Sequence, residues 1–184
     1  GLVDEDMRSR RFEDTVLPHL DAAYNLARWL TRDGADAEDV VQEAVLRALQ
    51  FFDGYRGGNS RAWLLTIVRN TCFNWMKRNR RSDMNVPYDD ESQMAVAPTY
   101  APPPAGDPET LLLARLEQRQ IDAAIGALAP PLREAIVLRE MEDLSYAEIA
   151  EIAGVPIGTV MSRLARARNL LRRALRAPDL DPRP

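Results

Sequence analysis

The stretch LSYAEIAEIAGVPIGTVMSRLARARNLLRRALR, residues 144–176, decides how the C-terminal part of the chain folds. Ser145 followed by Glu148 forms a capping box, a sequence signal that starts a helix. Gly154 follows the apolar residues of that helix and can adopt the left-handed conformation that ends it. Pro156 is tolerated at the start of a second helix, because the N–H that proline lacks would be unpaired there. The stretch therefore predicts two helices joined by a tight turn.

The second of these helices has an apolar side and a basic side. Val160, Leu164 and Leu171 recur at helical spacing and are expected to pack inward. Residues 155–176 contain six arginines and no acidic residue, and guanidinium groups with short hydroxyls suit the base edges of a DNA major groove. The side chains predicted to lie opposite the apolar side are Thr159, Ser162, Arg163 and Arg166. We therefore predict a DNA-binding helix-turn-helix; the alternative is an ordinary helical hairpin with a solvated basic face.

The amino-acid composition narrows the kinds of site that the chain can hold. Cys72 is the only cysteine and His19 the only histidine among 184 residues, which excludes an intramolecular disulfide, a multi-cysteine zinc site and a histidine cluster. No carboxylates stand in a recognisable metal or hydrolase spacing. We therefore expect no metal, no cofactor and no catalytic activity. No apolar run approaches the roughly 18 residues of a membrane span, and the first residues lack a signal-peptide core, so we expect no membrane insertion and a cytoplasmic location.

The net charge of −4 is unusual for a DNA-binding protein, but the charges are segregated along the chain. Residues 56–82 contain seven basic residues and no acidic one. Residues 83–109 contain six acidic residues and no basic one. We predict two local basic surfaces separated by an acidic segment, and weak DNA binding by the free chain, because its own acidity opposes the electrostatic attraction to phosphate.

The first half of the chain begins with two helical patterns. Residues 11–31 have apolar residues at helical spacing, interrupted by Pro18, which predicts a kink or two consecutive helices. A further helix follows, with Asp36 as its expected N-cap and Leu49 among its inward residues. The outer face of that helix carries Asp39, Gln42, Glu43, Leu46 and Arg47. From these residues alone, a solvated polar face is a sufficient interpretation.

A glycine-rich loop and a long basic helix come next. The loop DGYRGGNS, residues 53–60, lacks the lysine of a P-loop, and Asn59 or Ser60 is expected to cap the helix that follows it. The inward stripe of that helix is Leu64, Ile67, Val68, Thr71 and Trp75. A second stripe mixes aromatic, amide and cationic residues: Trp63, Thr66, Asn70, Phe73, Asn74 and Lys77. Such a mixture suits single-stranded nucleic acid, and core packing of Trp63 or Phe73 is the alternative.

The remaining patterns complete the predicted architecture. Residues 83–108 are acidic, rich in proline and without period, which predicts a flexible linker. Helical patterns resume at residues 109–128, and Pro130 starts another helix before the stretch quoted first. We therefore predict an all-α chain of two small helical domains, residues 8–82 and 109–177. A chain that binds duplex DNA at one end and a melted strand at the other is suited to promoter opening.

These motifs together resemble the extracytoplasmic-function (group IV) family of bacterial RNA polymerase sigma factors, within the sigma-70 superfamily. DAEDVVQEAVLRAL, residues 36–49, is similar to region 2.2 of that family, and SRAWLLTIVRNTCFNWMKRNRR, residues 60–81, to regions 2.3–2.4. Residues 128–175 resemble region 4. The resemblance implies a promoter-specificity subunit without catalysis of its own. It also implies three partners: the core polymerase through its β′ clamp helices and β flap, promoter DNA, and an anti-sigma factor.

The resemblance also implies roles for individual residues. The expected core polymerase-binding residues are Asp39, Gln42, Glu43 and Arg47. The expected −10 DNA-binding residues, hereafter the −10 surface, are Tyr55, Arg56, Asn59, Ser60, Trp63, Arg69, Asn70, Lys77, Arg78, Arg80 and Arg81. The expected −35 DNA-binding residues are Gly158, Thr159, Ser162, Arg163 and Arg166. The competing hypothesis is a conventional helix-turn-helix regulator that acts without core polymerase.

Overall fold

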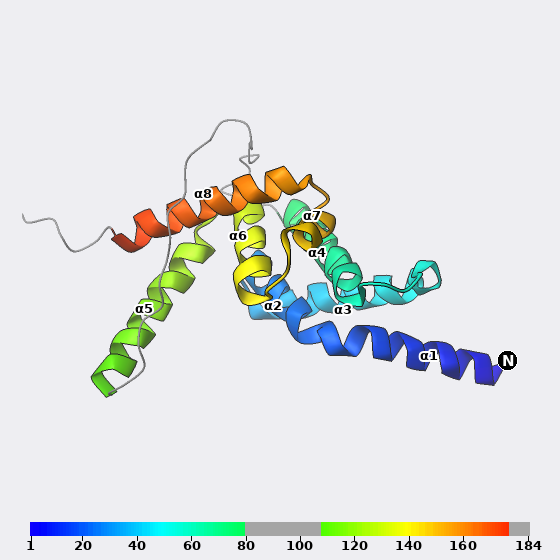
Figure 1. Ribbon diagram of the computed structural model, residues 1–184. Coiled ribbons are helices and arrows are strands. Elements are labelled where there is room, and N and C mark those ends of the chain that lie inside the picture. Colours follow the sequence, from blue (N-terminus) through cyan, green and yellow to red (C-terminus); the bar gives the residue numbers. More distant parts are fainter. Residues whose placement is uncertain (80–107, 177–184) are drawn as a thin grey trace, which may run out of the picture.

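The computed structural model describes residues 1–79 and 108–176, and these residues form helices and turns without any strand (Figure 1). The N-terminal half contains α1 (Leu2–Val16), the 3-10 turn η1 (Leu17–His19), α2 (Leu20–Thr31), α3 (Gly34–Gln50), the 3-10 turn η2 (Phe52–Gly54) and α4 (Ser60–Arg78). The C-terminal half contains α5 (Pro108–Gly126), α6 (Pro130–Ile136), the π-helical segment η4 (Val137–Met141), α7 (Tyr146–Ala153) and α8 (Ile157–Arg176). The predicted all-α fold is confirmed. The predicted linker lies outside the described residues except for Pro108, as do Arg80 and Arg81 of the −10 surface.

The N-terminal half is a bundle in which α2, α3 and α4 pack against one another. Leu26, Val40 and Leu64 lie in its core without solvent exposure. Pro18 lies in η1, so the helical pattern of residues 11–31 divides into two consecutive helices, as predicted. Figure 1 shows α1 extending away from the bundle.

Helix capping in this half follows the sequence signals with one difference. Asn59 caps α4 by accepting a 3.0 Å hydrogen bond from the Ala62 backbone N–H, as expected. The expected cap of α3 at Asp36 is wrong, because Asp33 takes that position and accepts a 3.0 Å bond from the Asp36 backbone N–H. Both residues carry a carboxylate suited to capping. Asp33 has the extended backbone of an N-cap, so the helix begins one turn earlier than predicted.

The C-terminal half contains the predicted helix-turn-helix. Ser145 and Glu148 form the capping box of α7, and Gly154 ends this helix in the left-handed conformation with φ +67°. Helix α8 follows directly after Pro156 and runs across the top of the molecule in Figure 1. Val160 and Leu164 of α8 are buried, as expected.

The predicted outward position of Arg163 is wrong. Arg163 is 9% exposed and lies on the buried side of α8 together with Val160, Leu164 and Ala167. Positions three, four and seven residues after Val160 fall on one face of a helix, so Arg163 belongs to the apolar stripe by its spacing. Its charge, rather than its position, placed it on the opposite side in the sequence interpretation.

Replacement of Gly154 by alanine is expected to lower the free energy of unfolding by about 1 kcal/mol, because a side chain disfavours positive φ. A Cβ at Gly154 would meet no atom within 4 Å, so the effect isolates backbone conformation. Gly158→Ala is the matched control, since Gly158 is a helical residue of α8 with equal open space, and alanine there should stabilise the helix. Urea denaturation followed by circular dichroism measures both. Equal effects of the two substitutions would contradict this account of Gly154.

The two halves of the molecule pack against each other. Helix α4 contacts α7, and α2 contacts α6. The buried residues of both halves belong to one hydrophobic cluster. None of the helices in the described part of the chain combines the length and the apolarity that would let it cross a membrane.

Candidate nucleic-acid interface

The loop before α4 is held by a cluster of aromatic rings. Tyr55 stacks on the buried Phe52 with a centroid separation of 6.0 Å, and its ring lies 4.8 Å from that of Trp63. The Tyr55 hydroxyl donates a 3.2 Å hydrogen bond to the backbone oxygen of Gly58. Gly57 and Gly58 have φ +84° and +92°, which side chains rarely adopt. The loop conformation therefore depends on these glycines and on Trp63. The Trp63 side chain is half-buried, so it packs against the loop while part of it stays exposed to solvent.

The stripe of α4 opposite the core is partly open to solvent. Asn70, Asn74 and Lys77 are exposed. Phe73 is half-buried beneath Arg69, whose guanidinium carbon lies 4.0 Å from the ring centroid. This cation–π contact fixes the position of the arginine along the helix. The open part of the stripe thus combines amides and cations next to a half-buried ring.

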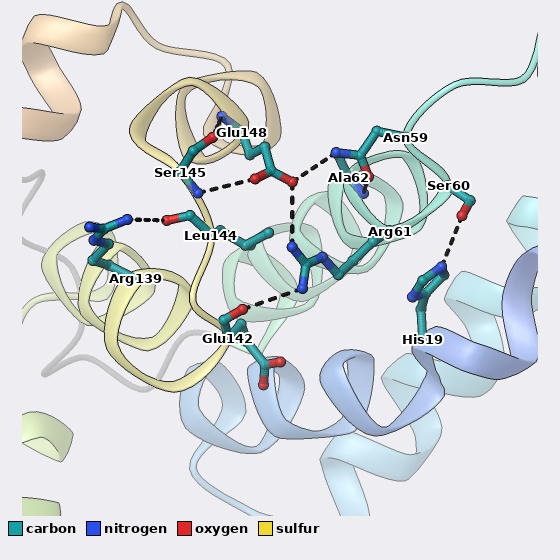
Figure 2. A network of polar contacts seen from close by, with 10 residues as sticks. All are labelled: His19, Asn59, Ser60, Arg61, Ala62, Arg139, Glu142, Leu144, Ser145 and Glu148. Carbon is teal, nitrogen blue, oxygen red and sulfur yellow. Dashed lines mark hydrogen bonds and ion pairs between the residues drawn. The ribbon is translucent and has the colours of Figure 1, made fainter.

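Residues 59–61 make polar contacts with side chains of other elements, and two of them, Asn59 and Arg61, contact the C-terminal half (Figure 2). Asn59 Nδ2 donates a 2.7 Å hydrogen bond to Glu148 Oε2, and Arg61 forms a 3.6 Å ion pair with the same carboxylate. Ser60 Oγ lies 2.9 Å from His19 Nε2. The Ser145 backbone N–H lowers the pKa of Glu148, and the Asn59 amide lowers it further. Sequence reasoning missed the approach of Glu148, because 89 residues separate it from Asn59.

The predicted core polymerase-binding face of α3 is available at the surface. Asp39 and Gln42 are exposed, and Glu43 accepts hydrogen bonds from Arg47 at 2.8 Å and from Arg78 at 3.3 Å. Leu46 is 61% exposed in the middle of this face. Leu46 borders a groove of about 360 Å³ between α2 and α3, lined by Leu20, Tyr24, Val41, Gln42, Val45 and Leu46. The apolar part of this face thus lies beside the charged part.

Sequence reasoning identified the charged residues of this face but not the α2 side of the groove. Leu20 and Tyr24 are half-buried, and the helical spacing that includes Leu20 only indicated a core. The expected inward position of Leu49 is wrong, because its side chain is 37% exposed near the end of α3. Leu46, an exposed leucine on a polar face, was the one sequence signal of an apolar contact surface.

The residues predicted to bind −35 DNA lie on α8 but differ in exposure. Gly158 and Ser162 are exposed, and the Ser162 hydroxyl donates a 3.0 Å hydrogen bond to the Gly158 backbone oxygen. Thr159 and Arg166 are half-buried. Arg163 is buried. Burial raises the pKa of Glu134, and the charges of Arg69 and Arg163 oppose that rise. The first turns of α8 therefore offer a mixed hydroxyl and guanidinium surface at one edge.

The described residues contain no group of three side chains suited to holding a metal ion. Cys72 is buried in α4, and its burial raises the pKa of the thiol to about 12, with the nearby Glu134 adding to the rise. A thiol of this kind is protonated at neutral pH and is a poor nucleophile. Cys72 is therefore a structural residue of the core.

Comparison with known proteins yields matches in both halves. The model of sigma-70 region 2 matches residues 15–82, and the model of sigma-70 region 4 matches residues 118–176. The ECF RNA polymerase sigma factor SigE of Mycolicibacterium smegmatis is 34% identical over 163 residues, which are 88% of this chain and 60% of that protein. The ECF RNA polymerase sigma-E factor of Escherichia coli K12 is 36% identical over 137 residues, 74% of this chain and 72% of that protein.

Two solved structures have the same fold. The sigma factor RpoE of Bartonella quintana, solved in complex with the anti-sigma factor NepR, matches with a TM-score of 0.66 and 31% identity, over 92% of this chain and 99% of that chain. CnrH, solved in complex with the cytosolic domain of CnrY, matches with a TM-score of 0.64 and 26% identity, over 93% and 91% of the two chains.

Proposed function

The chain belongs to the sigma-70 family as an ECF sigma factor, and we propose that it binds a bacterial core RNA polymerase and directs it to promoters through a −35 and a −10 element. Sigma factors of this family are not enzymes, so the role is one of recognition. The observation that supports the proposal is the presence on one chain of two different surfaces whose chemistry suits DNA. One is the basic helix α8 of a helix-turn-helix, and the other is the amide-rich and cationic stripe of α4.

Core polymerase would bind the exposed face of α3. Asp39, Glu43 and Arg47 offer charges of both signs there, while Leu46 and the groove beside it offer apolar area. A polar rim around an apolar centre is the usual composition of a protein interface. In this proposal the face receives the β′ clamp helices, and region 4 contacts the β flap.

The −10 element would be bound as a melted strand along α4 and the loop before it. Exposed amides such as Asn70 can hydrogen-bond the edges of unpaired bases, and Lys77 and Arg78 can hold phosphates. Residues 55–60 form a loop of fixed shape that could receive a base turned out of the strand. Capture of unpaired bases stabilises the open promoter, because these contacts are absent from duplex DNA.

Upstream, α8 would enter the major groove of the −35 element. Gly158, Thr159, Ser162 and Arg166 lie along its first three turns, where recognition helices contact base edges. The −35 contact anchors the polymerase on duplex DNA while region 2 engages the melted strand. We place both activities in the bacterial cytoplasm, and we propose residues 8–82 and 109–177 as the two functional domains.

An anti-sigma factor is a further proposed partner. Of the two solved structures described above, the sigma factor RpoE is bound to the anti-sigma factor NepR, and CnrH is bound to the cytosolic domain of CnrY. This chain shares their fold over more than nine tenths of its length. A partner of this kind would hold the chain away from core polymerase until it is released.

Run-off transcription with core polymerase, with and without the purified chain, tests the proposed function. We expect specific transcripts only when both components are present. A conventional helix-turn-helix regulator would instead bind its duplex site tightly without polymerase, and a gel-shift assay with the chain alone detects this. Tight duplex binding without transcription by the combined proteins would refute the proposal.

Asn70→Ala is expected to reduce discrimination between matched and mismatched −10 elements by about 5- to 150-fold, because the lost amide contributes roughly 1–3 kcal/mol of base recognition. Asn70 is exposed on α4, and its Oδ1 accepts a 3.3 Å hydrogen bond from Arg69. Transcription from promoter pairs that differ only in the −10 element measures the ratio. Gln50→Ala, an exposed amide at the end of α3, is the control. Reduced core binding with unchanged −10 discrimination would contradict the role of Asn70.

A further inference from the structure

A polar pocket of about 540 Å³ lies where α2 ends, beside α5 and η4. Pockets that bind small molecules usually measure about 300–1,000 Å³, so this one is large enough for a ligand of nucleotide size. None of the residues that line it is assigned above to DNA or to core polymerase. The lining residues that bear on its chemistry are Arg28, Trp29, Arg32, Asp33, Asp122 and Gly126.

Two arginines one helical turn apart, Arg28 and Arg32, bring positive charge to this pocket. Both residues are exposed. In the described part of the chain, neither guanidinium takes part in an ion pair or a side-chain hydrogen bond. Guanidinium groups match the geometry of phosphate oxygens and form strong charge-assisted hydrogen bonds with them. The two arginines are therefore available to an anionic ligand.

Arg32 has a backbone conformation that its residue type disfavours. It ends α2 in the left-handed region, with φ +61° and ψ +21°, where glycine or asparagine is the usual residue. A Cβ added to Gly126 would lie 3.2 Å from Arg32 Nη2 and 3.6 Å from Arg32 Cζ, so the guanidinium lies in the space that a side chain there would fill. Backbone strain of this kind is concentrated at sites that hold ligands. The strained residue thus places its charge at the pocket.

A third guanidinium, that of Arg133, lies close to the pocket. It donates a 2.9 Å hydrogen bond to the backbone oxygen of Gly126, which lines the pocket. Burial lowers the pKa of Arg133, and the charge of Arg32 lowers it further, so the two cations repel each other. An anion bound at Arg32 would offset this repulsion.

The other lining groups suit the base and the sugar of a nucleotide. Trp29 is half-buried and offers an aromatic surface on which a base can stack. Asp33 and Asp122 carry carboxylates, which accept hydrogen bonds from base N–H groups and from sugar hydroxyls. Phosphate alone would be repelled by these carboxylates, whereas a nucleotide can place its phosphates at the arginines and its N–H or O–H donors at the carboxylates.

We propose that this pocket binds a purine nucleoside diphosphate, with the phosphates on Arg28 and Arg32 and the base against Trp29. The site adds a small-molecule ligand to the promoter and polymerase contacts of the proposed function. Its binding is measured without DNA or polymerase, so the outcome does not depend on that function.

Isothermal titration calorimetry of the full-length chain tests the site with GDP, ADP and pyrophosphate as probes. We expect one nucleotide to bind per chain, and pyrophosphate to bind at least about fivefold more weakly because it has no base to stack. Binding of either nucleotide with this preference supports the proposal, and the stronger of the two identifies the base. Absence of binding by both nucleotides at millimolar concentration would overturn it, and so would equal affinity for pyrophosphate.

Arg32→Gly distinguishes a residue that binds a ligand from one that only ends a helix. Glycine adopts φ +61° without strain, so the urea midpoint of this variant should equal or exceed that of the unaltered chain. Its nucleotide affinity should fall by about tenfold or more, because the charge-assisted contact to phosphate is lost. A lower urea midpoint would show that Arg32 is required for stability and would count against the proposal.

Arg28→Gln, at an exposed position of α2, should also reduce nucleotide affinity by about tenfold. Arg173→Gln is the control, since it removes the same charge from an exposed position of α8 that lies outside the pocket. The affinity of this control should stay within about twofold of the unaltered chain. Unchanged nucleotide affinity in the folded double variant Arg28→Gln/Arg32→Gly would overturn the assignment of the pocket.

Discussion

Arg133→Ala is expected to lower the free energy of unfolding by roughly 3 kcal/mol or more, because it leaves buried hydrogen-bond acceptors unpaired and creates a cavity. Arg133 is 2% exposed in α6. Its Nη1 donates to the backbone oxygens of Gly126 at 2.9 Å and Leu128 at 3.1 Å, and its Nη2 donates to that of Leu30 at 3.2 Å. The Gly126 and Leu30 carbonyls lie in the last turns of α5 and α2, where helices lack their own donors, and the Leu128 carbonyl lies in the turn after α5. One guanidinium therefore joins two helix ends, one from each half.

The charge of Arg133 persists despite its burial. Burial, together with the nearby Arg32, lowers the pKa of Arg133 from its ordinary value to about 10. When folding lowers the pKa of a basic group, the protein is destabilised at every pH at which that group is charged in both the folded and the unfolded state. Neutral pH lies in this range. Hydrogen bonds to three carbonyls and the negative ends of two helix dipoles offset this cost. Their loss in the alanine variant therefore outweighs the gain from removing a buried charge.

Urea denaturation of Arg133→Ala, Arg133→Lys and Arg119→Ala separates these contributions. Arg119 is an exposed arginine of α5 and should unfold like the unaltered chain when replaced. Lysine keeps the charge but lacks the planar fork that reaches several carbonyls, so its stability should be intermediate. Equal stability of Arg133→Ala and Arg119→Ala would show that the buried guanidinium does not join the two halves.

Arg133 also illustrates which parts of the fold could be predicted from sequence. The capping box of Ser145 and Glu148 and the helix end at Gly154 were predictable, because each depends on residues a few positions apart. The bond from Arg133 to the Leu30 oxygen spans 103 residues and no local pattern indicates it. For the same reason the packing of the two halves could not be predicted, although each half was.

The candidate site likewise contains features that local sequence patterns predict and features that depend on contacts between distant residues. The amide and cationic stripe of α4 and the polar face of α3 follow from helical periodicity, and their assignment to DNA and polymerase came from the family resemblance. The capture of Asn59 by Glu148 and of Arg69 by Glu134 depends on tertiary contacts. Arg163 shows a different limit, since its spacing predicted burial but its charge favoured an exposed position. A charged residue in an apolar stripe indicates a buried counter-charge, which here is Glu134.

Arg166→Ala is expected to weaken holoenzyme binding to a matched −35 element by about 5- to 150-fold, which corresponds to the roughly 1–3 kcal/mol of a bidentate base contact. Arg166 follows Ser162 by four residues on α8, so both lie on the same side of the helix. It is half-buried, and a guanidinium there can extend from the helix into a major groove. Arg163→Ala is also expected to weaken the −35 contact, but Arg163 is buried and its charge acts on the buried Glu134, so its effect combines DNA binding with packing.

The measurement compares each holoenzyme on promoters with matched and altered −35 elements. The unaltered chain should lose affinity when the element is altered, whereas Arg166→Ala should bind both promoters nearly equally, because the contact that distinguishes them is absent. Arg173→Ala removes the same charge from an exposed position seven residues further along α8 and should retain the discrimination. A uniform loss of affinity on both promoters would mean that Arg166 holds phosphate rather than a base. Unchanged promoter use by both Arg163→Ala and Arg166→Ala would refute the assignment of α8 to the −35 element, because these two guanidinium groups are the only cations among the residues assigned to it.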